Sequence, residues 1–150
     1  MAGTIDVADI AAAIATRFGA VTPPAGLAAL RGATHLLPES LTELPYLLVF
    51  PFRPVEITYD PYSRSALLDW PLRFFFDRSP LPQRMADMYQ WWQSLYDLYP
   101  TSSLVDLGLG AYVREAKVTA AYLTTFEYPT GTEYPVIELF VRTNVGEPLS

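Results

Sequence analysis

The 150-residue sequence contains no cysteine, a single histidine and few charged residues. Without cysteine it can form no disulfide, thiol nucleophile or thiolate metal site. Charged residues make up 17% of the chain, against about 25% in ordinary globular proteins. The 10 basic residues are scattered and are outnumbered by 16 acidic ones, which gives a net charge of −6. This balance argues against binding nucleic acid through its phosphates, because such binding needs clustered Lys and Arg.

Long hydrophobic runs are also missing. No segment reaches the roughly 18 unbroken apolar residues that a membrane span requires, so we expect no membrane partner. Residues 1–9 lack the basic segment and following apolar stretch of an export signal. The length suits one domain, 1–150, with a single core. We therefore expect a single domain that is made in the cytoplasm.

Apolar mass is what the sequence has in excess. Hydrophobic residues make up 51% of the chain and aromatic residues 14%. With so little charge, part of the exterior must be apolar, and large exposed apolar patches normally mark interaction sites. The composition predicts a subunit that packs against copies of itself and against other proteins.

The N-terminal third predicts one helix and one irregular segment. Ile10, Ile14 and Phe18 recur at helical spacing, which predicts a helix over 7–18 that ends at Gly19. Residues 20–44 are rich in Pro, Gly and Ala and show little periodicity, so we expect an irregular crossing over the surface.

Three strand patterns follow. Residues 46–52 form an apolar run of the kind buried on both faces, and residues 55–59 alternate apolar with polar side chains. Residues 68–76 have the strongest alternation in the chain. Pro71 lies within this last run and cannot donate a ladder hydrogen bond, so we expect the strand to be at an edge or bulged.

The C-terminal half predicts a second helix and a long hairpin. Pro82 and Pro100 bracket a helix that is apolar round most of its circumference, which predicts burial on more than one side. Residues 112–126 and 134–143 predict two extended strands, longer than a small core covers, and residues 144–150 a tail. The predicted fold is α+β: a mostly antiparallel sheet of four to five strands, two main helices packed on it, and a long C-terminal hairpin.

No pattern for chemistry emerges. His35, the only histidine, has no nucleophile motif around it, and Gly108-Leu-Gly110 is too short for a dinucleotide-binding loop. Asp60, Asp69 and Asp77 have no spacing that marks a carboxylate pair or a metal site. We predict no enzymatic activity, with no catalytic residue, cofactor or metal.

Interface residues are the functional candidates. The aromatic face of the second helix could stack on sugars or bases, but no basic groove accompanies it, so packing is favoured. Arginine and large aromatics are enriched in interfaces. We also expect a charge at the hairpin tip, at Tyr128 or Tyr134, to reduce assembly without unfolding the chain. The candidate interface residues are Arg53, Arg64, Trp91, Tyr128, Tyr134 and Arg142.

The order of elements resembles the tail terminator proteins of long-tailed bacteriophages. The similar features are an Ala-rich helix over Asp6–Ile14, a Pro-flanked strand over Leu44–Phe50 and a meander ending in Leu72–Phe76. A Trp-containing helix over Met85–Tyr99 follows, and then a hairpin in which Tyr128 and Tyr134 flank a Gly-containing turn. The similarity covers nearly the whole chain and is one of layout, because the family has no catalytic signature to match.

The resemblance implies a virion protein at the head-proximal end of the tail. Such proteins form a homo-hexameric ring that caps the tail tube, ends its polymerisation and joins the tail to the head-closure or connector protein. The implied partners are copies of itself, the tube protein, the connector and the end of the tape measure, while DNA passes the lumen without specific binding. The alternatives are another neck component, such as a head-closure or head-tail adaptor protein, a tail-tube subunit, or a small-molecule-binding enzyme domain.

Overall fold

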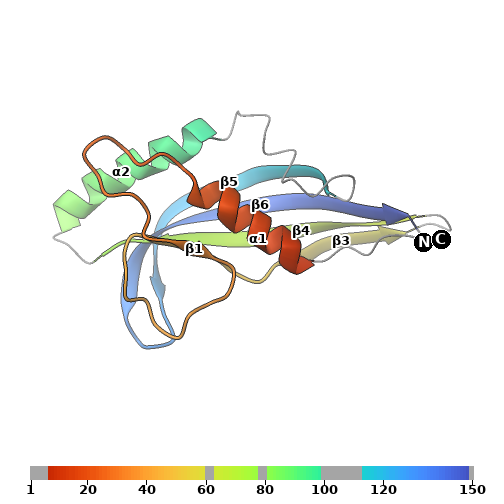
Figure 1. The fold of residues 1–150 in the computed structure, drawn as a ribbon, viewed down its shortest axis with the longest axis horizontal. Coiled ribbons are helices and arrows are strands. Elements are labelled where there is room, and N and C mark those ends of the chain that lie inside the picture. The colour runs from red at the N-terminus through yellow and green to blue at the C-terminus, as the bar shows by residue number, and fades with distance from the viewer. Residues whose placement is uncertain (1–6, 60–62, 78–80, 99–112, 149–150) are drawn as a thin grey trace.

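The structure, a computed structural model, describes residues 7–59, 63–77, 81–98 and 113–148. Its helices are α1 (Val7–Gly19) and α2 (Leu81–Leu98), and its strands are β1 (Ala33–Thr34), β2 (Tyr46–Val49), β3 (Arg53–Tyr59), β4 (Ser63–Phe75), β5 (Val113–Glu127) and β6 (Glu133–Pro148). Figure 1 shows the two helices over one sheet. The predicted α+β class is confirmed, with a six-stranded sheet rather than four to five strands.

The extra strand comes from the segment predicted to be irregular. Ala33 and Thr34 form β1, which pairs in parallel with Leu47 and Leu48 of β2. Gly19, the last residue of α1, lies against it, because a Cβ on Gly19 would come within 2.7 Å of the Ala33 Cβ. A residue with no side chain is therefore needed where the first helix passes this strand.

α1 is an amphipathic helix that covers the sheet. Ile10, Ile14 and Phe18 are buried, at the spacing that predicted the helix, and Asp9 lies in its first turn. Asp6, which leads this helix in the sequence, lies outside the described residues. The helix thus begins and ends within one residue of its predicted bounds over the described part.

β4 is an internal strand, not an edge. Along its whole length it pairs with β6, and on its other side it pairs with β3 over Arg64–Asp69 and with β2 over Leu72–Phe75. Pro71 falls between these two registers, where its carbonyl accepts a hydrogen bond from the Phe50 backbone N–H at 2.8 Å. The nitrogen and carbonyl of a strand residue face the same side, so the missing N–H of Pro71 is not needed by β6. The prediction of an edge or bulged strand was therefore wrong, since the β4–β6 register is also continuous through Pro71.

The two faces of the sheet have different cores. On the helix-covered face, Leu68, Trp70, Leu72, Phe74 and Phe76 of the β4 region pack with α1 and α2. The opposite face, here called the loop-covered face, has a smaller core of Leu48, Phe75, Tyr128 and Val136, closed by residues from the segment 35–45 such as Leu41 and Leu44. Figure 1 shows this segment beside the β5–β6 turn.

β5 and β6 form the long hairpin that the sequence predicted, 15 and 16 residues in length. Their connection turns at Gly131, whose φ of 91° favours glycine. The predicted tail is wrong for residues 144–148, which continue β6 and pair with Ser63–Leu67 of β4. Val145 is buried in the helix-covered core, so this end of the strand is part of the fold.

Candidate interaction surfaces

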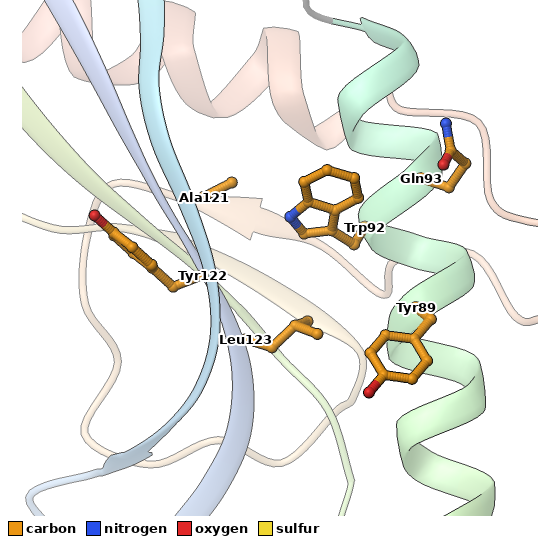
Figure 2. A pocket seen from close by; sticks show the side chains of 6 residues that line it. All are labelled: Tyr89, Trp92, Gln93, Ala121, Tyr122 and Leu123. Atoms are coloured by element: carbon orange, nitrogen blue, oxygen red, sulfur yellow. The ribbon is translucent and has the colours of Figure 1, made fainter.

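A hollow lies between the exposed side of α2 and the strand β5. Its volume is about 540 Å³. Figure 2 shows Trp92 and Tyr89 extending from α2 toward β5. Ala121 and Leu123 lie on the side of β5 that faces α2, and Tyr122 points away from the helix. The lining residues are Tyr89, Trp92, Gln93, Ala121, Tyr122 and Leu123. These six side chains offer aromatic and apolar surface and one amide, but no carboxylate, imidazole or thiol.

The aromatic stripe of α2 divides between the core and this hollow. Trp91, at 2% exposure, packs against the Phe76 ring with centroids 5.9 Å apart, and Met88 and Leu95 are buried beside it. Trp92 is half-buried, and Tyr89 is 55% exposed. The predicted placement of Trp91 at an interface was wrong, because its position on the helix faces the sheet. The wide apolar stripe predicted burial on more than one side, whereas within this chain one side is buried and Tyr89 and Met85 on another are exposed.

β5 forms one edge of the sheet. It pairs with β6, and within the described residues no strand pairs with its other side. The pairing is irregular at Val113/Glu115 and Val118/Ala120, and regular from Ala120 to Glu127. That regular stretch contains no proline and no charge before Glu127, and Leu123 is 41% exposed. Bulges, prolines, charges and a covering helix or loop are the usual protections of an edge strand, and this stretch has no bulge, no proline and no charge before Glu127.

β3 forms an edge on the far side of the same sheet. It pairs with β4 through one side, with an irregularity between Pro54 and Glu56. Val55 and Ile57 are exposed, Ile57 at 64%. Arg53 has 79% of its side chain exposed and approaches Asp69 only to 4.0 Å. The described side chains of β3 therefore present Val55 and Ile57 together with the exposed carboxylate of Glu56, with Arg53 as a solvent-facing cation at one end.

Arg142, a predicted interface residue, forms an ion pair inside the chain. Its guanidinium donates hydrogen bonds to both carboxylate oxygens of Asp69, at 2.8 and 3.0 Å, across the β4–β6 ladder. This hydrogen bonding, with the attraction of the carboxylate, raises the pKa of Arg142 against a smaller opposing effect of burial. The Asp69 side chain is nearly buried. Arg142 is thus the close partner of a nearly buried carboxylate that Arg53 approaches only to 4.0 Å.

Tyr128 is buried rather than exposed at a hairpin tip. It is 2% exposed, its ring packs edge-on against Phe75 at 5.9 Å, and its hydroxyl donates a hydrogen bond to the Pro38 carbonyl. Burial, and to a lesser degree the nearby Tyr134 phenol, raise the pKa of Tyr128. A charge at Tyr128 would be buried against Phe75, so it is expected to destabilise the fold, contrary to the prediction that the fold stays intact.

Tyr134 is half-buried and packs edge-on against the same Phe75 ring, at 5.8 Å. The two tyrosines and Phe126 therefore surround one phenylalanine on the loop-covered face. Offset and edge-on ring contacts add to the stability that burial provides. Tyr134 belongs mainly to this cluster, with only part of its side chain at the surface.

A second cross-strand ion pair lies on the loop-covered face. Arg73 Nε donates to Glu138 Oε2 at 2.6 Å, and the guanidinium carbon lies 4.4 Å from the ring centroids of both Phe50 and Phe126. Opposite charges directly across a ladder stabilise register, and the two rings shield the cation from water. This arrangement fixes the sheet and leaves little of either charge for a ligand.

The remaining sequence candidates do not converge. His35 is half-buried in the covering segment, and Asp77 is exposed after β4. Asp60 and Gly108–Gly110 lie outside the described residues, and of Arg64 only the backbone, within β4, is described. Across the described ranges no three His, Asp or Glu side chains gather as a metal site needs, and neither helix is long and apolar enough to span a membrane.

No protein-family model and no curated protein matches the sequence. The surfaces described above are therefore the basis for inferring a function. Sequence reasoning did not identify the exposed edges of β3 and β5. Ile57 and Leu123 lie in segments predicted to be strands, but a strand pattern alone does not tell an edge strand from an internal one. The signal that was available is the lack of charge and proline over 120–126.

Proposed function

We propose that this protein is a structural subunit of a bacteriophage tail that forms a ring at the head-proximal end, in the manner of a tail terminator. The observation that carries the proposal is the pair of unlike exposed apolar edges on one sheet: β3 with Val55 and Ile57, and β5 with the hollow under α2. Exposed apolar surface at two distant places on a small chain favours contact with more than one neighbour.

Unlike edges suit a ring. When one patch meets a different patch on the next copy, the contact repeats head to tail and closes if the rotation between copies closes. The layout of an Ala-rich first helix, a Pro-flanked strand, a Trp-containing second helix and a final hairpin agrees with the terminator resemblance. In this role the ring caps the tail tube, ends polymerisation and joins the tail to the connector.

The test is mass in solution. We expect sedimentation velocity to show a hexamer-sized species, either alone or after addition of purified tail tubes, and electron microscopy to show that species on one end of each tube. A chain that remains monomeric at all concentrations and never binds tube ends would contradict the proposal. Binding along the tube wall, or incorporation into it, would favour a tube subunit instead.

Other neck components are the nearest alternatives. A head-closure or adaptor protein would bind the connector without capping tubes, so pull-down on each partner separately distinguishes them. The hollow of about 540 Å³ also has room for a small aromatic-stacking ligand. A ligand that binds there and leaves the chain monomeric would favour the alternative of a small-molecule-binding enzyme domain.

A further inference from the structure

Every second residue of β5 directs its main-chain polar groups to the open edge of the sheet. The Pro135 carbonyl accepts a hydrogen bond from the Phe76 N–H at 3.0 Å, so it faces the β4 side of β6. Residues directly opposite in an antiparallel ladder either bond to each other or both face away. Thr125 is opposite Pro135, so its N–H and C=O face away from β6. The register is regular here, so the same holds for Leu123 and Glu127.

One of these residues, Leu123, also lines the hollow between α2 and β5. It is opposite Ile137, which packs in the helix-covered core, so Leu123 is on that face. Figure 2 shows its side chain on the side of β5 that Trp92 and Tyr89 approach. In a strand added to this edge, the residue opposite Leu123 has its side chain on the same face. That side chain enters the hollow of about 540 Å³.

Two carboxylates lie on the same face, further along β5. Glu127 is directly opposite Glu133, and both are exposed. Glu127 follows Leu123 by four residues, and side chains at even spacing in a strand share a face. Among the described side chains, neither carboxylate has an ion-pair partner. Like charges that face each other across a ladder repel, so a cation on a bound chain is favoured here.

The direction of an added strand fixes the order of its residues. The long strands of this sheet all pair antiparallel, and antiparallel pairing is slightly the more stable. The residue opposite Glu127 then precedes the residue opposite Leu123 by four positions. A matching segment therefore has Lys or Arg, three further residues and then a large apolar residue. The net charge of −6 also attracts a basic segment.

Among the described residues, the exposed edge of a second copy does not offer this segment. In β3, Arg53 precedes Ile57 by four positions. Arg53 is opposite Asp69 on the loop-covered face, however, whereas Ile57 is on the helix-covered face. The irregularity that separates them lies at Pro54/Glu56, and a proline and an exposed carboxylate hinder strand pairing. The segment is therefore assigned to another protein.

From these observations we propose that β5 binds an extended segment of another protein as an added antiparallel strand. A large apolar side chain of the segment lies in the hollow, and a Lys or Arg four residues earlier lies beside Glu127 and Glu133. The inference rests on the proposed function in taking the partner from the same assembly, and it leaves Val55 and Ile57 of β3 for contacts between copies. In strand addition, main-chain hydrogen bonds supply affinity and pockets for alternate side chains supply specificity.

A synthetic peptide tests this chemistry directly. The probe is Thr-Lys-Thr-Val-Thr-Leu-Thr-Val-Thr-amide with a fluorophore at its N-terminus, in which Leu follows Lys by four positions. We expect saturable binding to the wild-type chain by fluorescence anisotropy. Amide hydrogen exchange, followed by NMR, should slow at Leu123 and Thr125, whose N–H groups face the open edge. Replacing the Lys of the probe with Glu should weaken binding about tenfold, as juxtaposed like charges do.

N-methylation of the probe separates main-chain pairing from apolar contact alone. A methyl on the N–H of the probe's Leu removes a hydrogen bond to Leu123 and should weaken binding at least about tenfold. A methyl on the preceding Thr is the matched control, because that N–H faces away from β5, and should be tolerated. Equal losses from the two methylated probes would overturn strand addition.

Charge exchange on the protein checks the register. Glu127→Lys should weaken binding of the Lys probe about tenfold and should strengthen binding of the Glu probe relative to the wild-type chain. Glu56→Lys is the control, because Glu56 is an exposed carboxylate on the other edge of the sheet. This variant should leave the affinities of both probes unchanged. Equal losses from Glu127→Lys and Glu56→Lys, with no gain for the Glu probe, would overturn the register.

The outcome can be separated from that of the proposed function by measuring mass and probe binding on the same sample. Wild-type rings that do not bind the probe would overturn this inference and leave the ring standing. A probe that binds the monomer and is displaced as rings form would also overturn it, because a second copy would then occupy β5. A chain that binds the probe as expected but never forms rings or caps tubes would support the strand-binding edge and contradict the proposed function.

Discussion

The two faces of the sheet are closed by different means. The helix-covered face is closed by two helices whose apolar residues recur at regular spacing, such as Ile10, Ile14 and Phe18 of α1. The loop-covered face is closed by the segment 35–45 and by rings gathered round Phe75, with ion pairs beyond them. An amphipathic helix can therefore be found from the spacing of its apolar residues alone, whereas a core under an irregular segment depends on contacts between residues distant in the sequence.

The largest effect is expected from the helix-covered face. Trp91→Ala should lower the free energy of unfolding by about 3–5 kcal/mol, because the indole is buried against Phe76 and leaves a cavity. Urea denaturation of the purified chain measures it. Trp92→Ala is the control, and should cost clearly less because this indole is half-buried at the hollow. Equal costs for the two would mean that both indoles lie in the core.

On the loop-covered face, breaking the Asp69–Arg142 pair should cost about 2–3 kcal/mol. Arg142→Ala removes two hydrogen bonds from a carboxylate that is nearly buried, and an unpaired buried charge is costly. The double variant Asp69→Ala/Arg142→Ala should be more stable than Arg142→Ala alone, since it leaves no buried carboxylate without its hydrogen-bond donor. If the double variant is the less stable of the two, the penalty lies in lost packing and not in the charge.

Tyr128 tests how firmly the segment 35–45 is held. Tyr128→Phe keeps the ring against Phe75 but removes the hydrogen bond to Pro38, and should cost about 1–2 kcal/mol. Because the folded state raises the pKa of Tyr128, its neutral form is favoured by folding. This stabilisation is fully present below about pH 10, the ordinary pKa of tyrosine, and is lost as the pH rises through the raised pKa of the folded state. Tyr128→Phe should therefore reduce the loss of stability at alkaline pH. Denaturation at several pH values between roughly 9 and 11, around the ordinary pKa of tyrosine, measures this loss.

These residues show what could be predicted from the sequence. α1 and the alternation of β4 follow from spacing alone, and both agree with the structure over the described residues. Tyr128 was placed at the surface because it flanks a turn, but its partner Pro38 is 90 residues away in the chain. Residues 144–148 contain Asn, Gly and Pro and so indicate a tail, yet pairing with the start of β4 overrides that local preference. Long-range pairing decided both cases.

The candidate surfaces were only partly accessible to the same reasoning. Scarce charge indicated that part of the exterior is apolar, and the structure has exposed apolar side chains such as Tyr89 and Leu123. The choice of residues was less successful, because Trp91 and Tyr128 are buried and Arg142 is paired with Asp69. Whether an arginine faces solvent or a carboxylate depends on which strands are neighbours, and the sequence does not specify that order.

The smallest effect on stability is expected at the β3 edge, outside both cores. Arg53→Ala should change the free energy of unfolding by no more than about 0.5 kcal/mol, because the side chain is 79% exposed and Asp69 keeps its hydrogen bonds to Arg142. Chemical denaturation measures this, and sedimentation of the same sample measures association. A loss of stability as large as that of Arg142→Ala would show that Arg53 helps to hold the loop-covered face. Unchanged stability with weakened association would instead show that Arg53 contributes to self-association and not to the stability of the folded chain.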